Sequence, residues 1–195
     1  MDAITLTTEL EAVNEMLNAI GEGQVSTLDT ANADVAQCLR LLRDHSRKVQ
    51  SKGWWFNREE GFTISPDGNG NLVLPVNALK VDTSGDDRYN KPYVQRGLKL
   101  YDPINHTLVF TEAVTVDLVL GLSWDDLPQT VRSYITACAG LEFVDTDLAN
   151  EVRHAFTKDR RDNAYLELLK EEAEDSDYNM LKDSETGLEM LSRRI

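Results

Sequence analysis

The stretch VQSKGWWFNREEG (residues 49–61) marks the place where the hydrophobic period of this chain changes. Before it, apolar residues recur every three or four positions, which is the period of an amphipathic helix. After it, up to about Leu120, apolar residues recur at every second position, which is the period of a strand. Gly53 supplies a helix stop inside the stretch. The chain is therefore predicted to pass from helix to sheet immediately after Gly53.

A helix is predicted over residues 8–20, upstream of this point. Thr8 and Glu11 have the spacing of a capping box, in which each side chain satisfies a free backbone donor of the other. Gly21 then supplies the stop. The apolar face consists of Leu10, Val13, Leu17 and Ile20.

A second helix is predicted over residues 30–52. Asp29 or Thr30 is the expected N-cap, because short polar side chains accept hydrogen bonds from the first free N–H groups of a helix. Basic residues close to the predicted end suit the negative pole of the helix dipole. The apolar face consists of Val35, Leu39, Leu42 and Val49.

The strand-rich part is predicted to begin with a β-hairpin over residues 61–76. The turn formers PDGNGN (66–71) lie in its middle, between two runs with apolar residues at even positions. A further strand is predicted over residues 114–120, where apolar residues again occupy the even positions. The even apolar positions of the hairpin are Phe62, Ile64, Leu72, Leu74 and Val76.

A second turn signal is DPINH (102–106). The segments 94–101 and 107–110 flank it, so a second hairpin is predicted there. Residues 82–92 are polar and contain Gly and Pro, and they are predicted to form an exposed loop.

Helix is predicted again from Pro128, since proline is favoured at the first helical position. From about Asp147 a long charged helix is predicted to run to about Asp175. The helix that begins at Pro128 has an apolar face formed by Val131, Ile135, Cys138 and Leu141. The long charged helix has a narrow apolar stripe formed by Leu148, Val152, Phe156, Leu166 and Leu169.

Together these signals predict an α+β protein. Residues 1–53 and 121–175 are expected to form a discontinuous, antiparallel helical bundle, because each helical half alone has only one apolar face to bury. Residues 54–120 are expected to form a mid-chain antiparallel β insert. Residues 176–195 are polar with isolated apolar side chains, and they are predicted to form an extended C-terminal tail that orders by docking on a partner.

The composition argues against several classes of function. The chain has 195 residues, with 20 Lys+Arg against 34 Asp+Glu and a formal net charge of −14. Net negative charge repels nucleic acids and anionic membranes, so a general binder of either is not expected. No apolar run approaches the ~18 residues of a membrane span. The two cysteines, Cys38 and Cys138, are expected to be small core residues of a protein in a reducing compartment.

No catalytic residue, metal ligand or cofactor site is predicted. Adjacent acids such as Asp86–Asp87 and Asp125–Asp126 do not converge on one point in a helix or strand. The run 67–71 resembles the start of a calcium loop, but Leu72 and Ala78 stand where Gly and Glu are required. The three histidines share no ligand spacing; they are His45, His106 and His154.

The densest aromatic cluster is formed by Trp54, Trp55 and Phe56. Consecutive bulky rings at a junction of helix and strand must point in different directions. They are either core residues at a domain boundary or an anchor for a partner subunit, since aromatic residues are enriched at interfaces. The candidate interface residues are Trp54, Trp55 and Phe56, together with Tyr178, Asn179, Met180 and Leu181 in the tail.

Six motifs spread along the chain resemble one known family. They are ELEAVNEMLNAIG (9–21), VSTL (25–28), VQSKGWWFNREEG (49–61), YVQRG (93–97), Leu127–Pro128 and YNML (178–181). In this order they are similar to the tail tubular protein A family, the ring-forming tail adaptor, or gatekeeper, of short-tailed, autographivirus-type bacteriophages. The segment VQSKGWWFN is the most specific of them.

The resemblance implies a helical bundle with a β insert that assembles into a ring of twelve subunits. It implies a position between the portal and the nozzle (tail tubular protein B), with tail fibres attached near that junction. The ring would continue the channel through which the genomic DNA leaves, without specific DNA binding. Such a protein is a structural virion protein of the tail, assembled in the host cytoplasm, and not an enzyme.

The charge distribution is compatible with such a ring. Residues 121–195 carry 17 acids and 9 bases, and part of this excess is expected to face the lumen or a neighbouring subunit. Residues 176–195 are expected to dock on the portal, and the β insert is expected to contact the nozzle or the fibre. The alternative function is a tail-associated cell-wall hydrolase, which would need a convergent acid pair or a nucleophile with its base.

Overall fold

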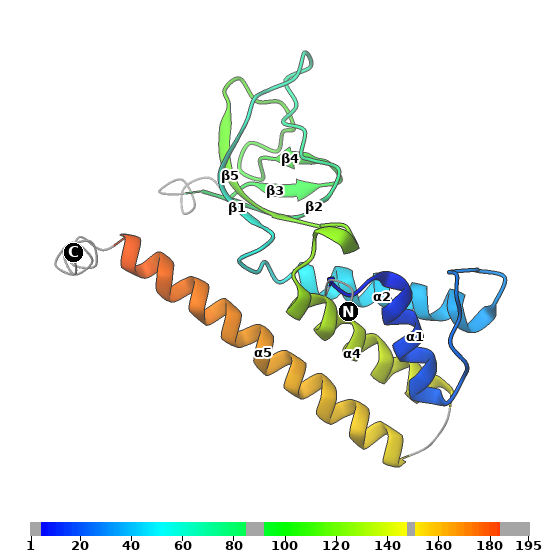
Figure 1. The fold of residues 1–195 in the computed structure, drawn as a ribbon. Helices are drawn as coiled ribbons and strands as arrows, with labels where there is room; N and C mark the ends of the chain where they lie inside the picture. The colour runs from blue at the N-terminus through cyan, green and yellow to red at the C-terminus, as the bar shows by residue number, and fades with distance from the viewer. Residues whose placement is uncertain (1–4, 85–91, 148–150, 184–195) are drawn as a thin grey trace. The chain divides into compact units, whose positions relative to one another are not determined.

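The computed structural model describes residues 5–84, 92–147 and 151–183, and its contacts divide the chain into two compact units. Unit 1 comprises Met1–Ser46 and Trp124–Ile195, and unit 2 comprises Arg47–Ser123 (Figure 1). Both ends of the chain contribute helices and the middle contributes antiparallel strands. This confirms the predicted α+β fold class.

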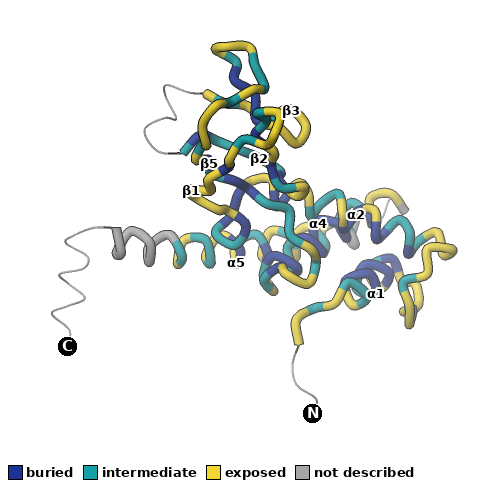
Figure 2. The backbone as a smooth tube through the Cα atoms, turned by 90° about the horizontal axis from the view of Figure 1, so that it is seen from above, coloured by how far each residue is buried: buried dark blue, intermediate teal, exposed yellow. Residues whose placement is uncertain are grey.

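Unit 1 is organised around the helix α4 (Gln129–Asp147). Helices α1 (Glu9–Ile20) and α5 (Glu151–Asp183) each pack on α4, and α2 (Ala33–Gln50) begins in the same unit. Residues 135–140 of α4 are all buried, so this helix has no exposed face over those turns (Figure 2). The single apolar face predicted for α4 therefore understated its burial.

Two side-chain contacts join α2 to α4. Gln37 Nε2 donates a hydrogen bond of 2.9 Å to Thr146 Oγ1. About two turns later on α2 and one turn earlier on α4, His45 Nε2 lies 2.9 Å from Glu142 Oε2. These polar contacts lie beside the buried apolar residues of α2, which include Val35, Cys38, Leu39, Leu41 and Leu42.

The start and end of α1 follow the sequence prediction. Thr8 Oγ1 accepts a hydrogen bond from Glu11 N at 3.2 Å, and Glu11 Oε2 accepts one from Thr8 N at 2.7 Å. The capping box is therefore confirmed. Gly21 ends the helix with a φ of 91°, a left-handed conformation that glycine adopts without steric cost.

The N-cap predicted for α2 is wrong. Neither Asp29 nor Thr30 caps the helix; Asn32 Oδ1 accepts from Asp34 N at 2.9 Å instead. The carboxylate of Asp29 accepts from Ala31 N at 2.9 Å and so belongs to a preceding turn. Several consecutive short polar residues before α2 have side chains that can accept a hydrogen bond from its first turn. The backbone conformation at the start of the helix decides which of them is the N-cap.

The apolar stripe predicted for the long helix is also wrong. Ala164 and Leu168 are buried, whereas Phe156, Leu166 and Leu169 are 73%, 63% and 39% exposed. The face of α5 that packs on α4 is therefore displaced from the apolar positions that the sequence suggested. Of the other two predicted members, Leu148 and the side chain of Val152 lie outside the described residues.

Helix α5 continues to Asp183, eight residues beyond the predicted end at Asp175. The first part of the predicted tail (176–195) therefore continues the helix as backbone. Residues 184–195 lie outside the described part of the chain.

Unit 2 contains a three-stranded antiparallel sheet and a separate two-stranded hairpin. The sheet has the order β1 (Arg58–Ile64), β5 (Val114–Leu120), β2 (Ala78–Thr83), and the hairpin joins β3 (Val94–Arg96) to β4 (Lys99–Tyr101). The predicted strand over residues 114–120 is confirmed as the central strand. The core consists of Ile64, Leu72, Leu74, Ala78, Leu100, Val116 and Leu118.

The hairpin predicted over residues 61–76 is wrong. Its first half is β1, which pairs with β5 and not with the second half. In the second half, Leu74 N donates to Leu98 O at 2.9 Å, and Leu72 O accepts from Leu100 N at 3.0 Å. Alternation places Leu72 and Leu74 in a core, but it carries no information on the segment that pairs with them.

The second predicted hairpin is partly right. Its turn is closed by two hydrogen bonds between Asp102 and Thr107, of 2.9 and 3.2 Å. However, residues 94–101 do not form one strand, because the chain reverses at Gly97, whose φ is 62°. This reversal makes the short β3–β4 hairpin.

Strand β2 was missed. Residues 82–83 were predicted to begin an exposed loop but end this strand instead, and the centre of that loop (85–91) lies outside the described residues. The register of β2 against β5 shifts between Ala78 and Lys80. Such an irregularity breaks the period of two by which a strand is recognised in a sequence.

Candidate functional site

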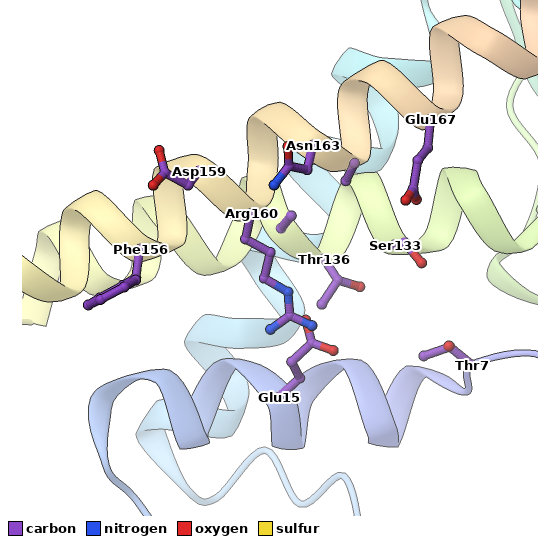
Figure 3. Close-up of a pocket in the computed structure, with 11 residues that line it drawn as sticks. Thr7, Glu15, Ser133, Thr136, Phe156, Asp159, Arg160, Asn163 and Glu167 are labelled. Carbon is purple, nitrogen blue, oxygen red and sulfur yellow. The ribbon is translucent and has the colours of Figure 1, made fainter.

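Unit 1 contains an open groove along α4, between α1 and α5. Its volume is about 480 Å³. Figure 3 shows the side chains that line it. The floor is made by small side chains of α4, namely Ser133, Thr136 and Ala137. A smaller hollow of about 150 Å³ adjoins the groove, shares Phe156 with it and reaches Gly140. Small residues on α4 thus keep the space between its two neighbours unfilled.

One ion pair bridges the two walls of the groove. Arg160 Nη2 from α5 lies 2.8 Å from Glu15 Oε1 of α1, and Figure 3 shows the two side chains pointing toward each other. Burial raises the pKa of the Glu15 carboxyl, and the charge of Arg160 opposes this rise. The cost of removing the carboxylate from water therefore outweighs its attraction to Arg160.

The rim of the groove combines apolar and charged groups. The Phe156 ring is 73% exposed although it lines the groove. Asp159 and Glu167 also line it, so the acids of the lining outnumber the single cation Arg160. An exposed ring, small floor residues and excess negative charge suit a segment of another chain that is both apolar and basic.

The structure separates the three aromatic residues of the predicted interface. Trp54 is buried, and its Nε1 donates to Val49 O at 2.8 Å. This burial favours the core alternative for Trp54. Trp55 and Phe56 are half-buried and form an edge-to-face pair with ring centres 5.2 Å apart. Contact of these rings with a partner subunit stays a prediction.

The other predicted interface residues are Tyr178, Asn179, Met180 and Leu181. Their backbone belongs to the last part of α5, and their side chains lie outside the described part of the chain. Their role as an interface also stays a prediction.

Two polar residues of the motif VQSKGWWFN have a role that sequence reasoning missed. Gln50 exchanges hydrogen bonds with the backbone of Leu122, of 3.1 Å to the carbonyl and 2.7 Å from the amide. Asn57 Nδ2 donates to Gln50 O at 2.9 Å and to Leu120 O at 2.7 Å. These bonds join the two ends of the strand-rich unit. The only signal in the sequence was the presence of two amide side chains on either side of the aromatic cluster at residues 54–56.

The histidines do not converge. His45 is joined to Glu142, His106 lies near Tyr101, and His154 Nδ1 lies 2.5 Å from Asp145. Among the described residues, no three potential ligand side chains are placed to hold a metal ion. The described helices also include none that is long and apolar enough to cross a membrane.

The remaining candidates are structural. Cys38 and Cys138 are buried and are not joined in a disulfide, and burial raises the pKa of Cys38 to about 12. The calcium-like run is a tight turn, because Asp67 Oδ1 accepts from the backbone N–H groups of Asn69 and Asn71, each at 2.8 Å.

The fold and the groove define a two-unit α+β protein whose helical unit carries an open groove. The chain belongs to the tail tubular protein family, whose profile matches residues 10–178. It is similar to tail tubular protein A of Klebsiella phage KP34, with 29% identity over 147 residues that cover 75% of this chain and 77% of that protein. The resemblance found in the motifs is therefore confirmed, and the protein is a structural component of a bacteriophage tail.

Proposed function

We propose that this chain is the ring-forming adaptor of a short tail, which joins the portal to the nozzle and continues the channel for genome ejection. The observation that carries the proposal is a helical unit of a tail tubular protein with an unfilled groove along its central helix. Subunits of a cyclic ring use one surface to receive the next copy. The groove is such a surface, and a ring of twelve copies is the expected assembly.

The acidity of the chain supports a role beside a DNA channel. The formal net charge is −14, and residues 121–195 carry 17 acids against 9 bases. Each phosphate that a protein neutralises retains the DNA, so a channel wall that must release a genome benefits from negative charge. Part of this excess is proposed to line the lumen or to face the neighbouring subunit.

The test is assembly on the portal. Purified full-length chain is mixed with the portal protein of the same phage and imaged by negative-stain electron microscopy, with portal alone as the control. The expected result is an added ring, coaxial with the portal, on one of its faces. Portals without added density, at any ratio of the two proteins, would contradict the proposal.

Contacts with the nozzle and the tail fibre, and the absence of catalysis, are part of the same proposal. The strand-rich unit is the proposed contact with the nozzle or fibre. The purified chain is expected to release no soluble fragments from bacterial cell walls, with a known hydrolase as the positive control. Release above the buffer blank would instead favour the cell-wall hydrolase.

A further inference from the structure

We propose that the groove between α1 and α5 binds residues 188–195 of a neighbouring copy of this chain. This inference rests on the proposed ring, and it names the segment that fills the open surface of each subunit. Three features carry it: the shape and chemistry of the groove, the sequence of the segment, and the distance between them within one chain.

The groove is an open surface whose lining mixes polar, charged and apolar side chains. Its volume of about 480 Å³ is continued by the adjoining hollow of about 150 Å³. Small residues form the floor, and Phe156 stands at the rim with 73% of its surface exposed. Amphipathic helices commonly bind such grooves by inserting apolar residues spaced three or four positions apart.

The segment has this spacing. Leu188, Leu191 and Ile195 follow the pattern i, i+3, i+7, which places three apolar side chains on one face of a helix. Arg193 and Arg194 add two positive charges. The segment is thus apolar on one side and basic near Ile195.

The charges of groove and segment are opposite. The lining contributes three carboxylates, from Glu15, Asp159 and Glu167, against the guanidinium of Arg160. Residues 188–195 contribute two arginines against Glu189. Complementary charge of this kind selects the partner and its orientation more than it adds affinity.

Leu191 of the same copy cannot reach Phe156, which lies at the end of the groove farther from Asp183 along α5. Along the continuous helix α5 (Figure 1), Phe156 and Asp183 are separated by 27 residues, or about 40 Å at the rise of an α-helix. Leu191 follows Asp183 by eight residues, which span at most ~29 Å when fully extended. Leu191 therefore reaches Phe156 only from another copy.

The test is disulfide capture between two different copies. One full-length variant carries Phe156→Cys and another carries Leu191→Cys, so that a dimer linked through these positions can form only between copies. The native Cys38 and Cys138 are buried and are kept. Both variants are mixed, assembled on the portal protein, oxidised, and analysed on a non-reducing gel.

The matched control replaces Phe156→Cys by Leu166→Cys. Leu166 lies on the same helix and is 63% exposed, but it does not line the groove. We expect about tenfold more cross-linked dimer for the pair at 156 and 191 than for the pair at 166 and 191, because binding raises the effective concentration of the two thiols. Unchanged circular dichroism of each variant establishes that it folds.

Two outcomes overturn the inference and leave the ring in place. The first is equal cross-linking of both pairs in assembled rings. The second comes from deleting residues 184–195, if the shortened chain no longer binds the portal but still associates with itself. The second outcome would assign the segment to the portal. If no ring forms at all, even with the unaltered chain, the proposed function itself fails and the inference fails with it.

Discussion

At the scale of single residues, Arg132 organises the entry into α4. Its side chain is only 3% exposed, and its guanidinium donates three hydrogen bonds to backbone carbonyls. These bonds go to Leu127 at 2.9 Å, Thr7 at 2.8 Å and Asp125 at 2.7 Å. One buried side chain therefore links the segment before α1, at Thr7, to the connection before α4, at Asp125 and Leu127. The Thr7 carbonyl also accepts from Trp124 Nε1 at 2.9 Å.

Replacing Arg132→Leu should lower the free energy of unfolding by about 3 kcal/mol, because the hydrogen bonds from Arg132 to three carbonyls are lost in a largely buried site. Urea denaturation followed by circular dichroism measures the change. The matched control is Arg160→Leu, since the Arg160 side chain is 60% exposed and its pairing with Glu15 should contribute less than ~1 kcal/mol. Equal losses for the two variants would refute the role given to Arg132.

A second residue-scale prediction concerns Glu15. Its pKa in the folded state is raised by burial, so its contribution to stability is present below the pKa of the unfolded chain and is lost as the pH rises. Glu15→Gln should therefore leave the melting temperature at pH 7 unchanged or raise it, although the variant breaks the ion pair with Arg160.

The control for Glu15 is Glu11→Gln. The backbone hydrogen bond from Thr8 is the main cause that lowers the pKa of Glu11, so its charged form favours the folded state at pH 7. This variant should lower the melting temperature. A clear drop for Glu15→Gln in the same assay would show that the ion pair stabilises the helical unit after all.

At the scale of elements, two turns of unit 2 depend on ionised aspartates. Asp67 Oδ1 accepts hydrogen bonds from the backbone of Asn69 and Asn71, each at 2.8 Å. Asp102 Oδ1 accepts one from Ile104 N at 2.8 Å, and the carboxylate also accepts from Asn105. Hydrogen bonds from backbone N–H groups lower the pKa of both carboxyls. The N–H group of Asn71 is the main cause for Asp67, and the N–H group of Asn105 is the main cause for Asp102.

The pH dependence of these turns follows from the sign of the shifts. Their stabilisation is present above the pKa of about 3.9 that aspartate has in the unfolded chain, and it is lost as the pH falls through the lowered folded values. The double variant Asp67→Asn, Asp102→Asn should be less stable at pH 7 and should lose stability less steeply below about pH 4. Urea unfolding at several pH values measures both effects. Identical pH profiles for variant and parent would contradict the prediction.

At the scale of the whole molecule, the net charge of −14 predicts weak contact with DNA. At about 0.15 M salt the full-length chain should not retain double-stranded DNA in a gel-shift assay, because it lacks the excess of cations that releases counterions from phosphates. A basic protein of similar size is the positive control. DNA binding that weakens as salt is added would show that basic residues cluster on one surface. It would contradict the proposal that the channel wall does not bind DNA.

Much of this architecture could be predicted from residues that are neighbours in sequence. The capping box of Thr8 and Glu11, the stop at Gly21, the change from helix to strand after Gly53 and the central strand over 114–120 all depend on contacts or periods within a few residues. The α+β class follows from the order of these periods. Family membership could also be predicted from short motifs along the chain.

Only the tertiary structure decided which of these elements lie against one another. It paired β1 with β5 instead of with residues 72–76, added β2, and turned Phe156 away from the core while burying Leu168. The groove between α1 and α5 has the same origin, since Glu15 and Arg160 meet although they are far apart in sequence. Periodicity defines an apolar face but not its partner, because the partner is chosen by packing among residues that are remote along the chain.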